Sequence, residues 1–248
     1  MSAGYRNVHP SAVAANRRFY EDLWSATSIV SPERFNTWPL LSELAARTAK
    51  RLEVGPGLRP RLPIAGTHFL DVSGEALARL RHYGGLPAQS DVTALPYHDA
   101  TFDLVCAFDV VEHVENDQEI LRELRRVSRA GAAIVFSVPL DPGRWSAFDD
   151  LVGHVRRYEA TALQDLMRAH DLVLERSAIF GMEPRSRLLL QLAAWGMRHH
   201  PERAMRWYNA VIMPLGLRLQ RPLALAPGMI DATGVGEILL VCRRAGES

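Results

Sequence analysis

The sequence has few cysteines, no excess of charge and no long apolar run. Its 248 residues include two cysteines, Cys106 and Cys242, both inside apolar runs, so buried thiols are expected and no metal site is predicted. With 29 basic and 28 acidic residues the net charge is +1, which disfavours a nucleic-acid partner. No apolar run approaches the roughly 18 residues of a transmembrane segment, and residues 1–10 lack the apolar core of a signal peptide. We therefore expect a cytoplasmic protein.

One glycine is missing from a motif that is otherwise present. An apolar strand beginning near Leu52 ends in Glu53 and is followed by Gly55, Pro56 and Gly57. A dinucleotide-binding fingerprint needs a third glycine at position 60, which is proline here, so a nicotinamide cofactor is disfavoured. The carboxylate of Glu53 would repel a pyrophosphate and attract a cation. The motif therefore favours a sulfonium nucleoside, S-adenosylmethionine.

Helical and strand patterns alternate between residues 37 and 180. Apolar repeats predict helices that begin near Thr37, Ser73, Asp117 and Thr161, the third ending at Gly131. Apolar runs predict strands from Leu52 and at 68–72, 87–92, 102–111, 132–139, 172–180 and 237–243. This alternation predicts a doubly wound α/β sheet.

A single domain over residues 1–248 is expected to have four parts. They are an N-terminal covering helix (1–36), a cofactor-binding core (37–180), a helical insertion (181–232) and the last strand (233–248). The insertion is too long for a turn and carries two helical patterns, Leu188/Leu192/Trp195 and Met205/Tyr208/Ile212. We expect it to fold as a lid over the cleft. Its aromatic and methionine residues favour an aromatic or lipid-like small-molecule acceptor.

Four successive strands are predicted to end in acids: Glu53, Asp71, Asp91 and Asp109. In a doubly wound sheet, ligands bind outside the carboxyl ends of the strands. The segments that contain these acids are Leu52-Glu-Val-Gly-Pro-Gly, Phe69-Leu-Asp-Val-Ser, Asp91-Val-Thr-Ala-Leu-Pro and Phe102-Asp-Leu-Val-Cys-Ala-Phe-Asp-Val-Val-Glu-His-Val. As an ordered series they resemble the class I S-adenosylmethionine-dependent methyltransferases over roughly residues 40–180.

That resemblance implies a Rossmann-like, mostly parallel seven-stranded sheet with an antiparallel last strand. It also implies that S-adenosylmethionine is the cofactor and S-adenosylhomocysteine the product. The implied cofactor-binding residues are Glu53 near the ammonium, Gly55, Pro56 and Gly57 beneath the methionine part, Asp71 and Val72 at the ribose, Asp91 and Val92 at the adenine, and Phe108 and Asp109 beside the methyl donor.

The chain departs from the family in the loop after the first strand. Arg59 replaces the third glycine of the family loop, and Pro60 and Pro63 leave only a short segment where the family usually has a helix. Either the loop is compressed, or cofactor binding is impaired. The second case would leave a module that binds S-adenosylmethionine or S-adenosylhomocysteine with little or no turnover, which is the alternative to a small-molecule methyltransferase.

Three residues are candidates for catalysis: His113, His154 and Tyr158. His113 follows the fourth strand and either acts as a base or shapes the pocket floor. His154 and Tyr158 lie after the fifth strand, where they either contact the acceptor or tie down their own loop. Histidine is the natural general base because its ordinary pKa is about 6.5.

Overall fold

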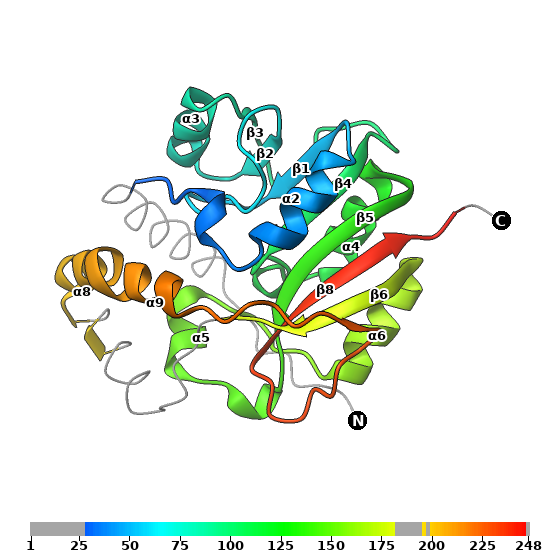
Figure 1. The fold of residues 1–248 in the computed structure, drawn as a ribbon. Helices are drawn as coiled ribbons and strands as arrows, with labels where there is room; N and C mark the ends of the chain where they lie inside the picture. Colours follow the sequence, from blue (N-terminus) through cyan, green and yellow to red (C-terminus); the bar gives the residue numbers. More distant parts are fainter. Residues whose placement is uncertain (1–27, 182–194, 197–198, 247–248) are drawn as a thin grey trace.

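A mixed eight-stranded sheet forms the centre of the protein in a computed structural model that describes residues 28–181, 195–196 and 199–246 (Figure 1). The strand order is β3-β2-β1-β4-β5-β8-β6-β7. The strands are β1 (Arg51–Val54), β2 (His68–Asp71), β3 (Leu86–Gln89), β4 (Phe102–Phe108), β5 (Ser128–Pro139), β6 (Leu172–Ile179), β7 (Ala226–Pro227) and β8 (Glu237–Arg244). The predicted fold class is confirmed. The predicted strand number is one too low, because the two-residue β7 adds an edge pair to β6.

The strand directions follow the expected pattern. Strands β3, β2, β1, β4 and β5 are parallel neighbours. The last strand, β8, is antiparallel to both β5 and β6 and lies between them. The antiparallel last strand is thus confirmed, and it fills a gap inside the sheet.

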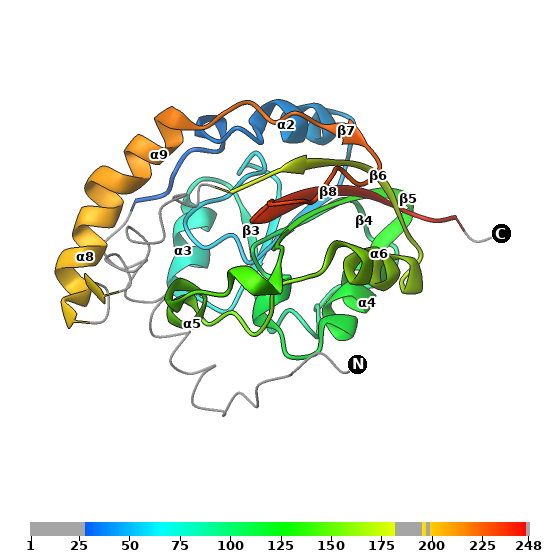
Figure 2. The same cartoon turned by 90° about the horizontal axis from the view of Figure 1, so that it is seen from below.

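Helices cover both faces of this sheet (Figure 2). Helix α2 (Trp38–Ala46) packs on one face, where Leu104 and Cys106 of β4 are buried beneath it. Helices α4 (Asp117–Val127) and α6 (Ala160–Ala169) pack on the other, over Val105 and Ala107. Since alternate residues of β4 point to opposite faces, a continuous apolar run is buried on both. Both cysteines are buried thiols, as predicted.

The predicted element ends are partly right. Ser73 caps α3 (Gly74–His82) by accepting a hydrogen bond from the Ala76 N–H. Gly131 does not end α4: it lies inside β5 with φ +74°, where the register between β4 and β5 shifts. The third strand stops at Gln89, so Asp91 lies beyond its end.

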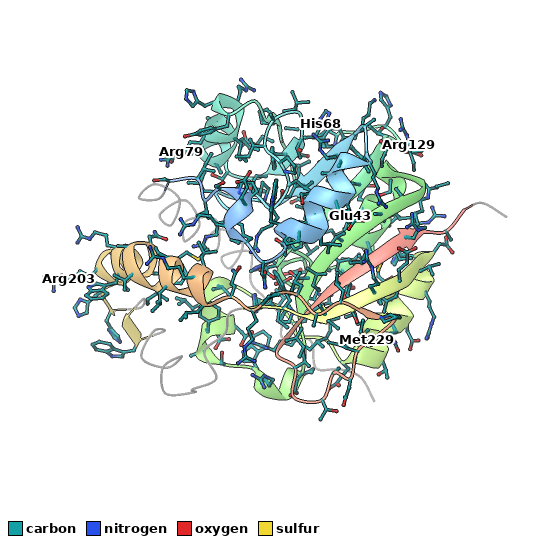
Figure 3. The ribbon with its side chains drawn as sticks, in the orientation of Figure 1. Glu43, His68, Arg79, Arg129, Arg203 and Met229 are labelled. Atoms are coloured by element: carbon teal, nitrogen blue, oxygen red, sulfur yellow. The ribbon has the colours of Figure 1, made fainter. Side chains whose placement is uncertain are left out.

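A helical rod extends from the body of the molecule (Figures 1 and 2). It comprises α8 (Pro201–Trp207), the π-helix η4 (Tyr208–Ile212) and α9 (Met213–Leu219), and Arg203 lies near its outer end (Figure 3). The predicted insertion is therefore helical over residues 201–219, whereas residues 220–232 are not helical and include β7. The predicted N-terminal covering helix and the pattern from Leu188 to Leu192 lie largely outside the described residues. Among the described residues, no helix is both long enough and apolar enough to cross a membrane.

Candidate active site

The carboxyl ends of β1, β2 and β4 lie side by side. The register pairs Val54 of β1 with Leu70 of β2 and with Ala107 of β4. Gly55, Asp71 and Phe108 each come directly after these paired positions. The residues expected at the cofactor therefore meet at one edge of the sheet.

Glu53 is buried at the end of β1 and faces the loop that follows. Its side chain is 1% exposed. The carboxylate accepts hydrogen bonds from the Arg61 N–H (2.9 and 3.1 Å to its two oxygens) and the Leu62 N–H (2.9 Å). Burial raises the pKa of Glu53 to about 7, against the lowering effect of these bonds. Glu53 thus fastens the loop between β1 and β2, and its contact with a cofactor ammonium stays a prediction.

Asp71 joins the glycine turn to the end of β2. One carboxylate oxygen accepts from the Gly57 N–H (2.9 Å) and the other from the Ser73 N–H (2.8 Å). Each carboxylate oxygen has a second lone pair, so two acceptor positions remain for a vicinal diol. The side chain is 7% exposed, and burial raises its pKa. The arrangement is compatible with the predicted ribose contact.

Gly55 needs to be glycine for two reasons. Its φ is +66°, a left-handed conformation that side chains disfavour. A Cβ there would also lie 2.6 Å from a methyl carbon of Val110. Between the two glycines of the turn, Pro56 is buried. The turn therefore brings the main chain of Gly55 into direct contact with the segment after β4.

The predicted adenine side of the site is open. Asp91 is exposed, and its carboxylate accepts from the N–H and hydroxyl of Thr93 (2.8 and 2.6 Å). Val92 is half-buried against the core, whereas Val72 is 45% exposed beside Asp71. The hydrogen bonds of Asp91 form a local turn, and its contact with adenine stays a prediction.

The end of β4 combines a buried ring with an exposed acid. Phe108 is 8% exposed, whereas Asp109 is exposed and has φ +54°, an uncommon value for a residue other than glycine. The Ser137 hydroxyl of β5 donates to Asp109 (2.5 Å) and accepts from its N–H (3.0 Å). Backbone strain of this kind gathers at functional sites.

Arg61 is a site residue that the sequence analysis missed. Its guanidinium lies over the ring of Phe35 at 3.9 Å, with Phe108 and Phe180 at 5.6 and 5.5 Å. Burial lowers its pKa, while the charges of Asp109 and Glu53 raise it. These contacts are cation–π interactions, which stabilise a guanidinium held over aromatic rings. The only sequence signal was an arginine between prolines.

The rings of His113 and His154 lie against each other. His113 lies in η2 (Val111–His113) after β4, and His154 follows α5 (Ala147–Val152). Their ring centroids are 4.9 Å apart. Burial and the neighbouring His154 lower the pKa of His113 to about 4, so its ring is neutral at pH 7. The structure brings these two candidates together, and a catalytic role for either stays a prediction.

A buried acid, Asp149, holds His154 in place. Its Oδ1 lies 2.8 Å from His154 Nδ1 and 2.7 Å from Arg157 Nε, and the Ser146 N–H donates to Oδ2 (2.8 Å). Although burial raises the pKa of Asp149, the hydrogen bonds from His154 and Arg157 hold it below its ordinary value. The sequence signal for this group was weak, because its members belong to no common motif.

Tyr158 belongs to the core. It is 6% exposed, and its hydroxyl donates to Asp117 at the start of α4 (3.1 Å). Burial raises the pKa of this hydroxyl. These contacts support the view that Tyr158 ties down its own segment, and a direct contact with an acceptor stays a prediction.

The helical rod contacts the loop after β1 through Tyr208. Arg59 donates to the Tyr208 hydroxyl (3.4 Å), and its guanidinium lies 5.2 Å from the centre of that ring. The residue that replaces the family's third glycine therefore joins the loop to the insertion. This contact favours the predicted lid, whose position over a cleft stays a prediction.

A cavity of about 550 Å³ lies away from these strand ends. It is lined by η1 (Pro32–Arg34), the start of α2 and residues 217–225. None of the predicted site residues lines it. The strand-end residues are thus adjacent along the sheet edge, while this cavity is a separate feature.

Comparisons with known proteins agree with the fold and the strand-end pattern. A family model described as a methyltransferase domain matches residues 52–136, from β1 into β5. Norajmaline N-methyltransferase from Rauvolfia serpentina is 47% identical over 45 residues, 18% of this chain and 15% of the relative. Ajmaline N-methyltransferase from the same organism is 28% identical over 86 residues, 35% of this chain and 24% of the relative. The similarity therefore spans about a quarter or less of each relative.

A solved structure extends the likeness over nearly the whole chain. A protein from Galdieria sulphuraria, provisionally described as a sarcosine dimethylglycine methyltransferase, has a TM-score of 0.57 and 16% identity. The match covers 94% of this chain and 98% of that one. At this identity the likeness establishes the fold.

Proposed function

The chain belongs to the class I S-adenosylmethionine-dependent methyltransferases, and on that premise we propose that it methylates a small-molecule acceptor held beside Asp109, His113 and His154. The cofactor would lie along the ends of β1 and β2. One observation supports this placement most directly: Asp71 hydrogen-bonds the Gly57 N–H, which brings an acid and a glycine turn together. That arrangement leaves acceptor positions on Asp71 for ribose hydroxyls.

Methyl transfer from a sulfonium requires little acid–base catalysis by the protein. The sulfonium of S-adenosylmethionine is already an activated donor, and transfer is an in-line displacement by the acceptor atom. Holding the two reactants in line can contribute roughly 7 to 11 kcal/mol. The site residues would bind and orient the reactants and exclude water, with Phe108 and Asp109 beside the methyl donor by family resemblance.

An amine is the acceptor class that we favour. The two curated relatives are named N-methyltransferases, although they match only a part of this chain. The exposed acidic side chain of Asp109 lies on this side of the site and suits a cationic amine. The aromatic side chains of the rod favour an acceptor with an apolar part.

Titration calorimetry with S-adenosylhomocysteine tests the cofactor site. We expect Asp71→Ala to weaken binding by roughly 1 to 3 kcal/mol, because one or two hydrogen bonds are lost. Asp231→Ala is the control, since Asp231 accepts a hydrogen bond from the Thr233 N–H in an exposed turn far along the chain. Equal affinity of wild type and Asp71→Ala would contradict the assignment.

Turnover separates the two functions left open by the sequence. The wild-type protein should transfer methyl groups from S-adenosylmethionine to members of a panel of amines and phenols. Tight binding of S-adenosylhomocysteine without transfer to any member would favour the alternative, a binding module. That module is suggested by Arg59 in place of the family's third glycine.

A further inference from the structure

Three side chains of the acceptor side form a group that the proposed reaction does not require. Glu112, His113 and His154 each present one possible ligand atom, and these atoms lie within 4.8 Å of one another. Glu112 and His113 come from η2 after β4, and His154 comes from the loop after α5. Two separate segments thus bring one carboxylate and two imidazoles together.

Both imidazoles are oriented through the same ring atom. His154 Nδ1 lies 2.8 Å from a carboxylate oxygen of Asp149, and His113 Nδ1 lies 3.2 Å from the carbonyl oxygen of Gly153. Because these oxygens only accept, each Nδ1 carries the proton in the neutral ring, and the lone pair belongs to Nε2. Metal-binding histidines usually have this arrangement, in which an oxygen acceptor fixes the ring and its tautomer.

The orienting group is itself held firmly. Asp149 is fully buried and accepts hydrogen bonds from Arg157 and from Ser146 as well as from His154. Arg157 also donates to the carbonyl oxygen of Leu140 at the end of β5 (3.3 Å). His154 is therefore positioned by the sheet and not by its loop alone.

Glu112 requires a positively charged or donating partner. It is 1% exposed, and its Oε1 lies 3.7 Å from His154 Nε2, which is too long for a hydrogen bond. Its Oε2 has no hydrogen-bond partner among the atoms of the described residues. A buried carboxyl oxygen without a partner is costly. A bound cation would satisfy both oxygens.

We propose that Glu112, His113 and His154 bind a divalent ion of the zinc type, through a carboxylate oxygen and the two Nε2 atoms. Two histidines and a glutamate are a known catalytic zinc set, which leaves a fourth position open. With bonds of about 2.0 to 2.1 Å, neighbouring ligand atoms of a tetrahedron lie about 3.4 Å apart. Small side-chain rotations would bring the present atoms to that spacing.

A bound ion would restrict the chemical class of the acceptor, and this inference rests on the proposed function. The open position would take a nitrogen or oxygen atom of the acceptor, next to Asp109 and the methyl donor. A bound metal lowers the pKa of a ligand that it holds. The favoured acceptors are therefore those with a chelating hydroxyl or amine beside the methylated atom.

Titration calorimetry of the full chain with zinc chloride, after removal of metal with a chelator, tests the site. We expect one zinc ion per chain for the wild type, and affinity at least tenfold weaker for Glu112→Gln and for His154→Gln, since changes to groups that only orient metal ligands already cost 10- to 100-fold in affinity. His170→Gln is the matched control, because His170 lies on the outer surface beside Gln118 and should leave zinc affinity unchanged.

S-adenosylhomocysteine affinity, measured on the same proteins, shows that the variants are folded and separates the two proposals. A wild type that binds no zinc, or ligand variants that bind it as well as His170→Gln does, would overturn the metal site. A wild type that binds zinc but not S-adenosylhomocysteine would overturn the proposed function alone. Because Glu112→Gln changes only one atom, it keeps the test valid should His154→Gln unfold.

Discussion

The acids at the ends of β1 and β2 are satisfied by main-chain groups, whereas Asp149 of α5 is bound mainly by side chains. Glu53 and Asp71 accept hydrogen bonds from the N–H groups of Arg61, Leu62, Gly57 and Ser73. Asp149 instead binds Arg157 and His154. The first set of acids, Glu53 and Asp71, thus shapes a loop. The acid of the second set, Asp149, fixes ionisable side chains in position.

The largest expected effect comes from removing the acid of the second set. Asp149→Ala should lower the free energy of unfolding by about 3 to 5 kcal/mol, because Arg157 would remain as an uncompensated buried charge. Urea unfolding measures this change. Glu175→Ala, which breaks the partly exposed pair with Arg243, is the control and should cost less than about 1 kcal/mol. Similar losses of unfolding free energy for both variants would contradict the view that Asp149 compensates a buried charge.

The pH dependence of the free energy of unfolding tests the role of Glu53, an acid of the first set. Its pKa is about 7 in the folded protein and about 4.5 when unfolded, so the folded state retains a proton between these values. The stability from Glu53 is fully present below pH 4.5 and is lost as the pH rises to about 7. From pH 5.5 to pH 8 this loss should be about 2 kcal/mol.

The measurement is urea unfolding at both pH values for wild type and Glu53→Gln. The variant cannot ionise at this position. Between pH 5.5 and pH 8 its free energy of unfolding should therefore fall by about 2 kcal/mol less than that of the wild type. Parallel curves for the two proteins would mean that Glu53 is ionised throughout, held as a carboxylate by the N–H groups of Arg61 and Leu62.

The smallest expected effect concerns the glycine turn. Gly55→Ala and Gly228→Ala both place a side chain at a φ near +65°, which costs about 1 to 2 kcal/mol. A Cβ at Gly55 meets Val110 at 2.6 Å, whereas one at Gly228 meets nothing within 4 Å. Gly55→Ala should therefore cost about 1 kcal/mol more in thermal or urea unfolding. Adding Val110→Ala should remove the clash, and a double variant with no recovered stability would refute its cause.

The sequence predicted the features that depend on local pattern. The apolar run of β4, the Ser73 cap and the acid at the end of β2 are each specified within a few residues, and all three are present. The two-residue β7 could not be predicted, because its pairing with β6 depends on the path of a distant segment. The end of β3 was misjudged because pairing with β2 stops at Gln89, two residues before Asp91.

The partners of the site residues were harder to predict than the residues themselves. Glu53 was expected to need a cation or a nearby backbone, and it binds N–H groups whose direction depends on loop conformation and not on residue type. Asp149, His154 and Arg157 carry no shared motif, since the contact between them arises from the turn after α5. The sequence contains Glu112 beside His113. The structure adds that Glu112 is buried and that its Oε2 has no hydrogen-bond partner among the described residues.

The central position of β8 has a consequence for synthesis on the ribosome. Its neighbours β5 and β6 are complete many residues before Glu237 is made, and in the folded protein both pair with β8. Until then the nascent chain carries two open strand edges, which are templates for aggregation. A truncation that removes Glu237–Arg244 should therefore yield insoluble protein and not merely a less stable enzyme.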